Sequence, residues 1–183
     1  MTKLYNIIYA DPPWQYNANF KGKPSRDVEH HYSTMPTSEI MRLPIRNLCD
    51  NDCILFMWIT YPKMQDALNV IKAWGFEYKT CGFIWVKSNK NNGKPFWGMG
   101  KWTRSNTEIC LIATKGKPKR LRNDIHQLIY RPIEKHSKKP PEVRDLIVKL
   151  CGDLPRVELF SRQAPMGWDY WGNEVNDGRL NTV

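Results

Sequence analysis

The chain has 183 residues, of which 28 are Lys or Arg and 18 are Asp or Glu, so its formal net charge is +10. Hydrophobic residues make up 41% and charged residues 25%, which indicates an ordinary folded protein and excludes a disordered chain. No apolar run reaches the roughly 18 residues of a membrane span, and five cysteines without a CxxC pair argue against a disulfide framework and a structural zinc site.

Short apolar runs bounded by turn residues predict strands, and apolar residues at helical spacing predict helices. The run from Tyr5 to Ala10, for example, ends at Asp11-Pro12-Pro13, and the pattern that begins at Pro62 keeps helical spacing up to Gly75. The expected elements, in chain order, are strand 5–10, loop 15–36, short helix 39–43, strand 53–59, helix 62–75, strand 78–86, loop 88–106, strand 109–113, a basic loop to residue 139 with a short strand at 128–129, helix 143–150 and strand 156–160.

This alternation of strands and helices predicts an α/β fold. Several strands are uniformly apolar, which is typical of a mainly parallel sheet with helices on both faces. The loop 88–106 contains no helical pattern, so the strands that it joins are expected to form an antiparallel edge pair. Ligands of such sheets bind beyond the carboxyl ends of the strands, where Asp11 and the residues after Glu158 are expected to lie.

The positive charge is clustered along the chain. Residues 115–139 hold nine Lys and Arg and two acids, and residues 87–104 hold five basic residues and no acid. Clustered positive charge favours a polyanionic partner such as nucleic acid, although a plainly solvated basic face explains it equally well. Neutralising the basic residues at 117–122 would separate the two explanations through the salt dependence of nucleic-acid binding.

Tryptophan is abundant, with eight in the chain, and several lie in polar, loop-like contexts. These are Trp14, Trp97, Trp102, Trp168 and Trp171. Loop aromatics interleaved with Lys and Arg suit stacking on unpaired bases. The alternative, that the rings pack beneath loops, is expected to hold for at least half of them.

The motif that carries chemistry is Asp11-Pro12-Pro13-Trp14, directly after a predicted buried strand. A tight turn explains Asp-Pro but not two prolines followed by an aromatic residue. The motif resembles that of the amino-methyltransferases, which put a methyl group on the exocyclic amine of a base. The lone pair of that amine is delocalised into the ring, so it is a poor nucleophile. The Asp11 carboxylate and the Pro12 carbonyl can accept its hydrogens, and Trp14 can stack on a base that has left its duplex.

Further segments make the chain resemble the DPPW-type N6-adenine methyltransferases of the MT-A70 type. That family includes the catalytic subunit of the eukaryotic messenger-RNA adenosine methyltransferase and bacterial and phage members. The matching segments, which keep the family's order from residue 5 to residue 174, are Ala10–Trp14, His31–Met35, Met57–Thr60, Trp85–Lys87, His136–Pro140, Val157–Arg162, and Gly167-Trp168 with Trp171–Glu174.

The resemblance implies a Rossmann-like S-adenosylmethionine-dependent methyltransferase fold in its permuted, beta-class motif order. It implies transfer of a methyl group from S-adenosylmethionine to the N6 amine of adenine in DNA, by a bacterial or phage enzyme. Two alternatives stay open. One is the same reaction on RNA adenosine, and the other is a non-catalytic nucleic-acid-binding subunit of a methyltransferase complex.

The resemblance also implies roles for individual residues. Asp11, Pro12, Pro13 and Trp14 form the catalytic loop, and Lys139 binds the methionine carboxylate of the donor. Glu158 accepts from the ribose hydroxyls. The expected cofactor-binding residues are Asp11, Lys139, Glu158, Leu159, Arg162, Asn173 and Glu174. The expected substrate-binding residues are Trp14, Tyr32, Lys87, Trp102 and Arg104. No metal is expected. His136 and the pair His30-His31 are possible ligands, but neither has the further ligands at suitable spacing that a metal site needs.

Some features depart from the family pattern. In the eukaryotic relatives a segment before the strand 5–10 helps to hold the donor's adenine. Here only about four residues precede that strand, so we expect other residues to form that half of the adenine pocket, and no separate target-recognition domain is expected. We therefore expect one methyltransferase domain over residues 1–183, in which the loops 15–36, 88–106 and 115–135 contact the target. A homodimer or a second subunit is the alternative. Without a signal peptide, the expected location is the cytoplasm of a bacterium or of a phage's host.

Overall fold

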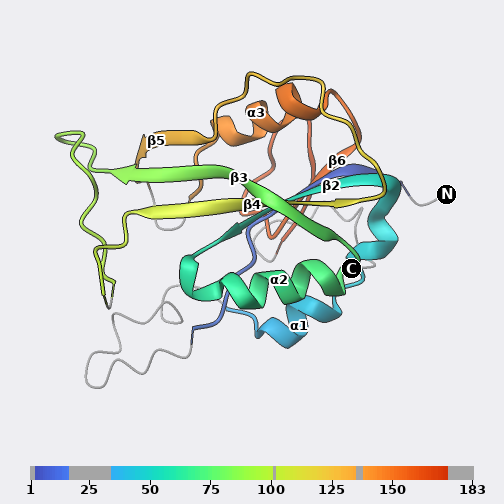
Figure 1. Ribbon diagram of the computed structural model, residues 1–183, viewed down its shortest axis with the longest axis horizontal. Coiled ribbons are helices and arrows are strands. Elements are labelled where there is room, and N and C mark those ends of the chain that lie inside the picture. Colours follow the sequence, from blue (N-terminus) through green and yellow to red (C-terminus); the bar gives the residue numbers. More distant parts are fainter. Residues whose placement is uncertain (1–2, 17–33, 101, 135–137, 173–183) are drawn as a thin grey trace.

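Figure 1 shows the computed structural model, which describes residues 3–16, 34–100, 102–134 and 138–172. Its elements are β1 (Tyr5–Ala10), α1 (Thr37–Arg42), the 3₁₀ turn η3 (Ile45–Leu48), β2 (Cys49–Ile59), the 3₁₀ turn η4 (Tyr61–Lys63), α2 (Met64–Ala73), β3 (Glu77–Ser88), β4 (Thr107–Lys115), β5 (Leu128–Pro132), α3 (Glu142–Cys151), β6 (Arg156–Leu159) and β7 (Asp169–Trp171). Every predicted strand and helix is present, and β7 is an addition.

The described strands form one seven-stranded sheet in the order β5-β3-β4-β2-β1-β6-β7. Neighbouring strands are parallel except where β4 pairs with β2 and with β3. The mainly parallel sheet and the antiparallel pair joined by the loop 88–106 are therefore confirmed. The pair was expected at the border of the sheet, but β5 is the outermost strand there and pairs in parallel with β3.

Helices cover both faces of this sheet. Figure 1 shows α1 and α2 on one side and α3 on the other. Ala67, Val70 and Ile71 place the apolar stripe of α2 on the first face. Val143 and Ile147 place that of α3 on the second. Both faces of the sheet are thus covered, which explains why β1 reads as a continuous apolar run.

The parallel strands bring distant segments together at their carboxyl ends. This end of the sheet, where the sequence predicts the site, is here called the catalytic edge. Ala10, at the end of β1, lies beside Met57 of β2 and Leu159 of β6. Because β4 is antiparallel, its first residues meet the last residues of β2, with Ile59 opposite Ile109. The loop 88–106 therefore emerges at the same edge as Asp11.

The direction of β4 has a second consequence for the loop 115–135. The strand ends opposite Cys53, near the beginning of β2, so residues 116–127 leave the sheet at the edge opposite Asp11. The basic residues at 117–122 thus lie away from the catalytic edge, and any contact of theirs with nucleic acid would be made at a distance from Asp11. Within the described ranges, no helix combines the length and the apolar character of a membrane span.

Candidate active site

The segment after β1 is held in place by its own backbone and by the core. The N–H of Trp14 donates to the Pro12 carbonyl at 2.8 Å, and the N–H of Met35 donates to the Pro13 carbonyl at 2.8 Å. Trp14 is buried, and its indole N–H donates to the Trp58 carbonyl at 3.2 Å. The two prolines and the buried ring therefore fix the position of the Asp11 carboxylate, which is 28% exposed.

Lys139 joins two acidic groups at the catalytic edge. Its Nζ lies 2.7 Å from Asp11 Oδ2 and 3.3 Å from Glu108 Oε2. The other carboxylate oxygen of Glu108 lies 2.5 Å from the Nζ of Lys87. Four charged groups thus alternate in sign along a line from Asp11 to Lys87, here called the ion chain. Three of them come from positions predicted to belong to the site, and Glu108 is new.

The ion chain shifts the pKa of its members in different directions. Burial raises the pKa of Asp11 above its usual value, although the neighbouring Lys139 opposes this. Burial also favours the neutral form of Glu108, but Lys139 and Lys87 outweigh it, so the pKa of Glu108 lies below its usual value. Burial disfavours the ammonium of Lys139, but the Asp11 and Glu108 carboxylates raise its pKa overall. Asp11 is therefore the carboxylate of the ion chain whose neutral form burial favours overall.

These shifts predict a pH dependence. The predicted role of Asp11, to accept hydrogens of an amine and then its proton, needs the ionised carboxylate, so we expect activity above the pKa of Asp11 and its loss as the pH falls through that pKa. We expect the acid limb of the single-turnover pH–rate profile to lie above the ordinary aspartate value of about 4. Glu108 and Lys139 keep their charges through that range. A rate that stays constant down to about pH 4, in a protein still folded by circular dichroism, would contradict the assignment.

Glu158 is buried, one residue before the end of β6, and is held by a side chain of α3. Arg144 of α3 binds it with two hydrogen bonds, from Nε at 2.5 Å and from an Nη at 2.8 Å. The Ser161 hydroxyl lies 3.2 Å from Glu158 Oε1 and donates at 2.7 Å to the Gln163 carbonyl. A carboxylate offers about four lone-pair sites. Glu158 can therefore accept from a ligand hydroxyl while it stays bound to Arg144.

The Arg144–Glu158 pair predicts a stability effect. The two side chains are only 17% and 10% exposed, so Arg144→Met leaves a nearly buried carboxylate without its cation. We expect the free energy of unfolding, measured in urea, to fall by about 1–3 kcal/mol. Arg122→Met is the matched control, because the Arg122–Asp124 pair is more than half exposed on both sides, and we expect its loss to leave the free energy of unfolding nearly unchanged. Equal losses in the two variants would show that the Arg144 pair is no more than a surface contact.

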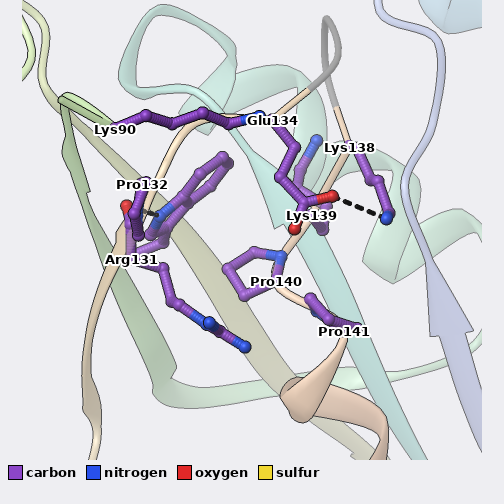
Figure 2. A pocket seen from close by; sticks show the side chains of 9 residues that line it. Lys90, Arg131, Pro132, Glu134, Lys138, Lys139, Pro140 and Pro141 are labelled. Atoms are coloured by element: carbon purple, nitrogen blue, oxygen red, sulfur yellow. Dashed lines mark hydrogen bonds and ion pairs between the residues drawn. The ribbon is translucent and has the colours of Figure 1, made fainter.

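A cleft lies beside Lys139. It has a volume of about 150 Å³ and is lined by Trp85, Lys90, Arg131, Pro132, Glu134, Lys138, Lys139, Pro140 and Pro141. Figure 2 shows these side chains around the opening, with Glu134 paired to Lys138 on its rim. The volume is below the roughly 300–1,000 Å³ of a typical ligand pocket. This cleft alone is therefore too small for a nucleoside-sized ligand, and it adjoins the ion chain through Lys139.

Comparison with known families decides which family the chain belongs to. A family model described as MT-A70 matches residues 5–174, which is nearly the whole chain. The chain belongs to the MT-A70 family. Membership confirms the resemblance and, with it, the methyltransferase class and a fold consistent with this family.

The MT-A70 relatives differ in how much of their length this chain spans. A type II methyltransferase, M.MunI, of a Mycoplasma species is 37% identical over 97% of this chain and 81% of its own length. An MT-A70-like N(6)-adenosine-methyltransferase of Arabidopsis thaliana is 29% identical over 96% of this chain but 24% of its own length. The human N(6)-adenosine-methyltransferase catalytic subunit METTL3 is 29% identical over 94% of this chain and 28% of its own length.

The structure brings most of the predicted MT-A70 site residues to the catalytic edge. Asp11, Lys139 and Lys87 meet in the ion chain, and Arg162 lies near enough for its charge to lower the pKa of Asp11. Leu159 is fully buried, so a ligand could meet only its backbone. The predicted residues Tyr32, Asn173 and Glu174 lie outside the described residues, and their roles stay predictions.

Two of the three predicted target-binding aromatics lie in the described residues, and they occupy different environments. Trp102 is 97% exposed in the loop between β3 and β4. Trp14 is buried with its N–H bonded, so in this structure its ring anchors the catalytic loop, and stacking on a base stays a prediction. Arg104 lies over the ring of Trp97, 4.8 Å from its centroid.

Sequence reasoning missed Glu108 and Arg144. The signal for Glu108 was available, since it is an acid at the start of an otherwise apolar strand run. Arg144 also gave a signal, because it is a charged residue at helical spacing from the apolar Ile147 and Val148. In the described ranges, no group of three or more His, Cys, Asp or Glu side chains is placed to hold a metal ion. The three histidines considered above lie outside those ranges.

Proposed function

We propose that the chain transfers a methyl group from S-adenosylmethionine to the exocyclic N6 amine of adenine in DNA. The observation that carries the proposal is the Asp11 carboxylate at the end of the central strand β1, with the Pro12 carbonyl beside it and the Lys139 ammonium 2.7 Å away. This places two hydrogen-bond acceptors and one cation at the catalytic edge, as methyl transfer to a base amine requires.

The chemistry asked of these residues is specific. Asp11 and the Pro12 carbonyl accept the hydrogens of the adenine amine, which favours a tetrahedral nitrogen and restores its lone pair as a nucleophile. The Pro12 carbonyl already accepts from Trp14, and its second lone pair serves the amine. When bound, S-adenosylmethionine supplies the electrophilic methyl group. Asp11 holds the proton that the nitrogen releases once the new N–C bond has formed.

The charged residues suit the donor that we propose. The Lys139 ammonium offers a cation to the donor's carboxylate, in a position shared with Asp11 and Glu108. Glu158 offers an acceptor to a ribose hydroxyl, and Arg144 keeps that carboxylate in place. Binding of the donor therefore gives Lys139 a third carboxylate partner, in addition to those of Asp11 and Glu108. This couples donor binding to the position of Asp11.

The names and lengths of the relatives favour DNA as the polymer. This chain covers 81% of the length of the type II methyltransferase, but only about a quarter of the length of the relatives named for N(6)-adenosine. The same reaction on RNA is the second candidate, because a pocket for one extruded adenine serves either polymer. The presence of Asp11, Lys139 and Glu158 together supports an active enzyme over a non-catalytic subunit. We also propose the cytoplasm as its location, and a homodimer or a second subunit as further aids to target recognition.

Mass spectrometry of nucleosides tests the function. The protein is incubated with methyl-labelled donor and, separately, with duplex DNA, single-stranded DNA and RNA of the same sequence. We expect labelled N6-methyladenine in DNA, and none from the Asp11→Ala variant prepared in parallel. Label in RNA alone would select the second candidate. Label in neither polymer, from protein that binds S-adenosylhomocysteine, would favour the non-catalytic subunit.

A further inference from the structure

The loop between β3 and β4 projects as a hairpin, whose described residues 95–100 and 102–106 are here called the finger. Its base is closed by a bridge between Ser88 and Pro95 and by the N–H of Lys87, which donates to the Asn106 carbonyl at 2.8 Å. Figure 1 shows the loop reaching beyond the ends of both strands. The finger is therefore a defined extension of the sheet.

Two glycines let the arms of the finger touch. A Cβ added at Gly98 would lie 1.8 Å from the Ser105 carbonyl oxygen, and one added at Gly100 would lie 2.1 Å from that of Thr103. Since neither position has room for any side chain, the arms meet backbone to backbone. This close approach places Trp102 at the turn of the hairpin.

The finger carries its large apolar side chains in solvent. Trp102 is 97% exposed, Trp97 71% and Met99 67%. The guanidinium of Arg104 covers the Trp97 ring at 4.8 Å, but Trp102 projects from the tip. The segment 87–104 holds five basic residues and no acid. An exposed aromatic tip on a basic stem is complementary to a polyanion with flat apolar rings, whereas two copies of a basic finger repel each other.

The finger also stands next to the candidate active site. Lys87 and Glu108, which flank its base, are members of the ion chain that ends at Asp11. Trp102 stands six positions before Glu108, and an extended chain rises at most about 3.4 Å per residue. The tip therefore lies within about 20 Å of Glu108, which corresponds to at most about six base steps of a duplex.

We propose that Trp102 inserts into the base stack of duplex DNA and fills the space that the target adenine leaves when it is extruded toward Asp11. The inference rests on the proposed function. Extrusion unstacks a base pair, and apolar side chains are known to occupy such gaps. In a single strand the adenine is already unpaired and leaves no gap. The contribution of Trp102 is therefore confined to duplex substrate.

Single-turnover methylation tests the role of Trp102. The probes contain a target adenine whose position has first been located by mass spectrometry of methylated DNA fragments. Three are compared: the duplex, its single strand, and the duplex with a non-pairing base opposite the target adenine. We expect Trp102→Ala to slow methylation of the duplex roughly 10- to 100-fold, the size of one lost aromatic–base stack. The mismatched duplex should be affected less and the single strand hardly at all. Trp102→Phe should restore most of the duplex rate.

Tyr78→Ala is the matched control, because Tyr78 is also an exposed aromatic, at 43%, but it lies at the start of β3, opposite Ala113 near the end of β4, away from Asp11. It should leave all three rates unchanged. An equal effect of Trp102→Ala on duplex and single strand would overturn the inference while the proposed function stands. A change of oligomeric state in Trp102→Ala, measured by sedimentation, would instead make the finger a contact between copies. A parent protein that methylates none of the probes would remove the proposed function, and the inference with it.

Discussion

Asp11→Ala is expected to slow methyl transfer by at least about 100-fold, while the variant stays folded. The carboxylate is an acceptor that strengthens as the adenine nitrogen becomes tetrahedral, and loss of one preorganised polar group of this kind costs on the order of 100- to 1,000-fold. The fold should tolerate the change, because Lys139 keeps Glu108 as a partner and the backbone bonds of the loop do not involve the Asp11 side chain. Single-turnover transfer of labelled methyl groups measures the effect.

Asp11→Asn separates charge from shape. The amide keeps one acceptor oxygen at nearly the same place but removes the negative charge beside Lys139. We expect it to be slow as well, because it cannot take the proton that the amine releases. Thermal melting and affinity for S-adenosylhomocysteine serve as controls for folding. A near-normal rate in either variant would remove Asp11 from the catalytic role.

Lys139→Ala and Glu158→Ala are each expected to weaken binding of the donor and of its demethylated product. A charge-assisted hydrogen bond contributes about 1.5–3 kcal/mol, so the dissociation constant of S-adenosylhomocysteine should rise about 10- to 150-fold. Nucleic-acid binding without donor should barely change. Calorimetric titration with S-adenosylhomocysteine measures the change in its dissociation constant for each of the two variants.

The structure supplies a matched control for Lys139. Lys138 is the neighbouring residue and carries the same charge, but it pairs with Glu134 where both side chains are about 40% exposed. Lys138→Ala should bind S-adenosylhomocysteine like the parent. Lys139→Ala also leaves Asp11 and Glu108 without their shared cation, so Lys139→Arg is the second variant if the first fails to fold. Unchanged affinity in the folded Lys139 and Glu158 variants would show that the donor is held by other residues.

The Lys139 variant should further change the pH–rate profile. Its ammonium opposes the rise that burial causes in the pKa of Asp11. Without it the pKa of Asp11 rises further, so the acid limb of the rate should move to higher pH. This shift would distinguish the role of Lys139 beside Asp11 from its role in donor binding.

Much of the fold and part of the site could be predicted from the sequence. Strands and helices show in local periodicity, because each element buries one face or both against the same sheet. Asp11-Pro12-Pro13-Trp14 shows as a motif, and its place after a buried strand already locates Asp11 at a carboxyl end. Lys139 and Glu158 were found through motifs that keep the order of the MT-A70 family, not through periodicity.

Two features of the site depend on the tertiary structure alone. One is the direction of β4, and the other is the contact between residues that lie far apart in the chain. Because β4 runs against its neighbours, Glu108 at its start enters the ion chain, and the basic residues after its end leave at the opposite edge. Asp11 and Lys139 are 128 positions apart, and their contact depends on the order of the strands. Local sequence reports which residues are apolar and how they are spaced. Which charges meet, and whether Trp14 is buried, depend on the packing of elements that the local pattern does not contain.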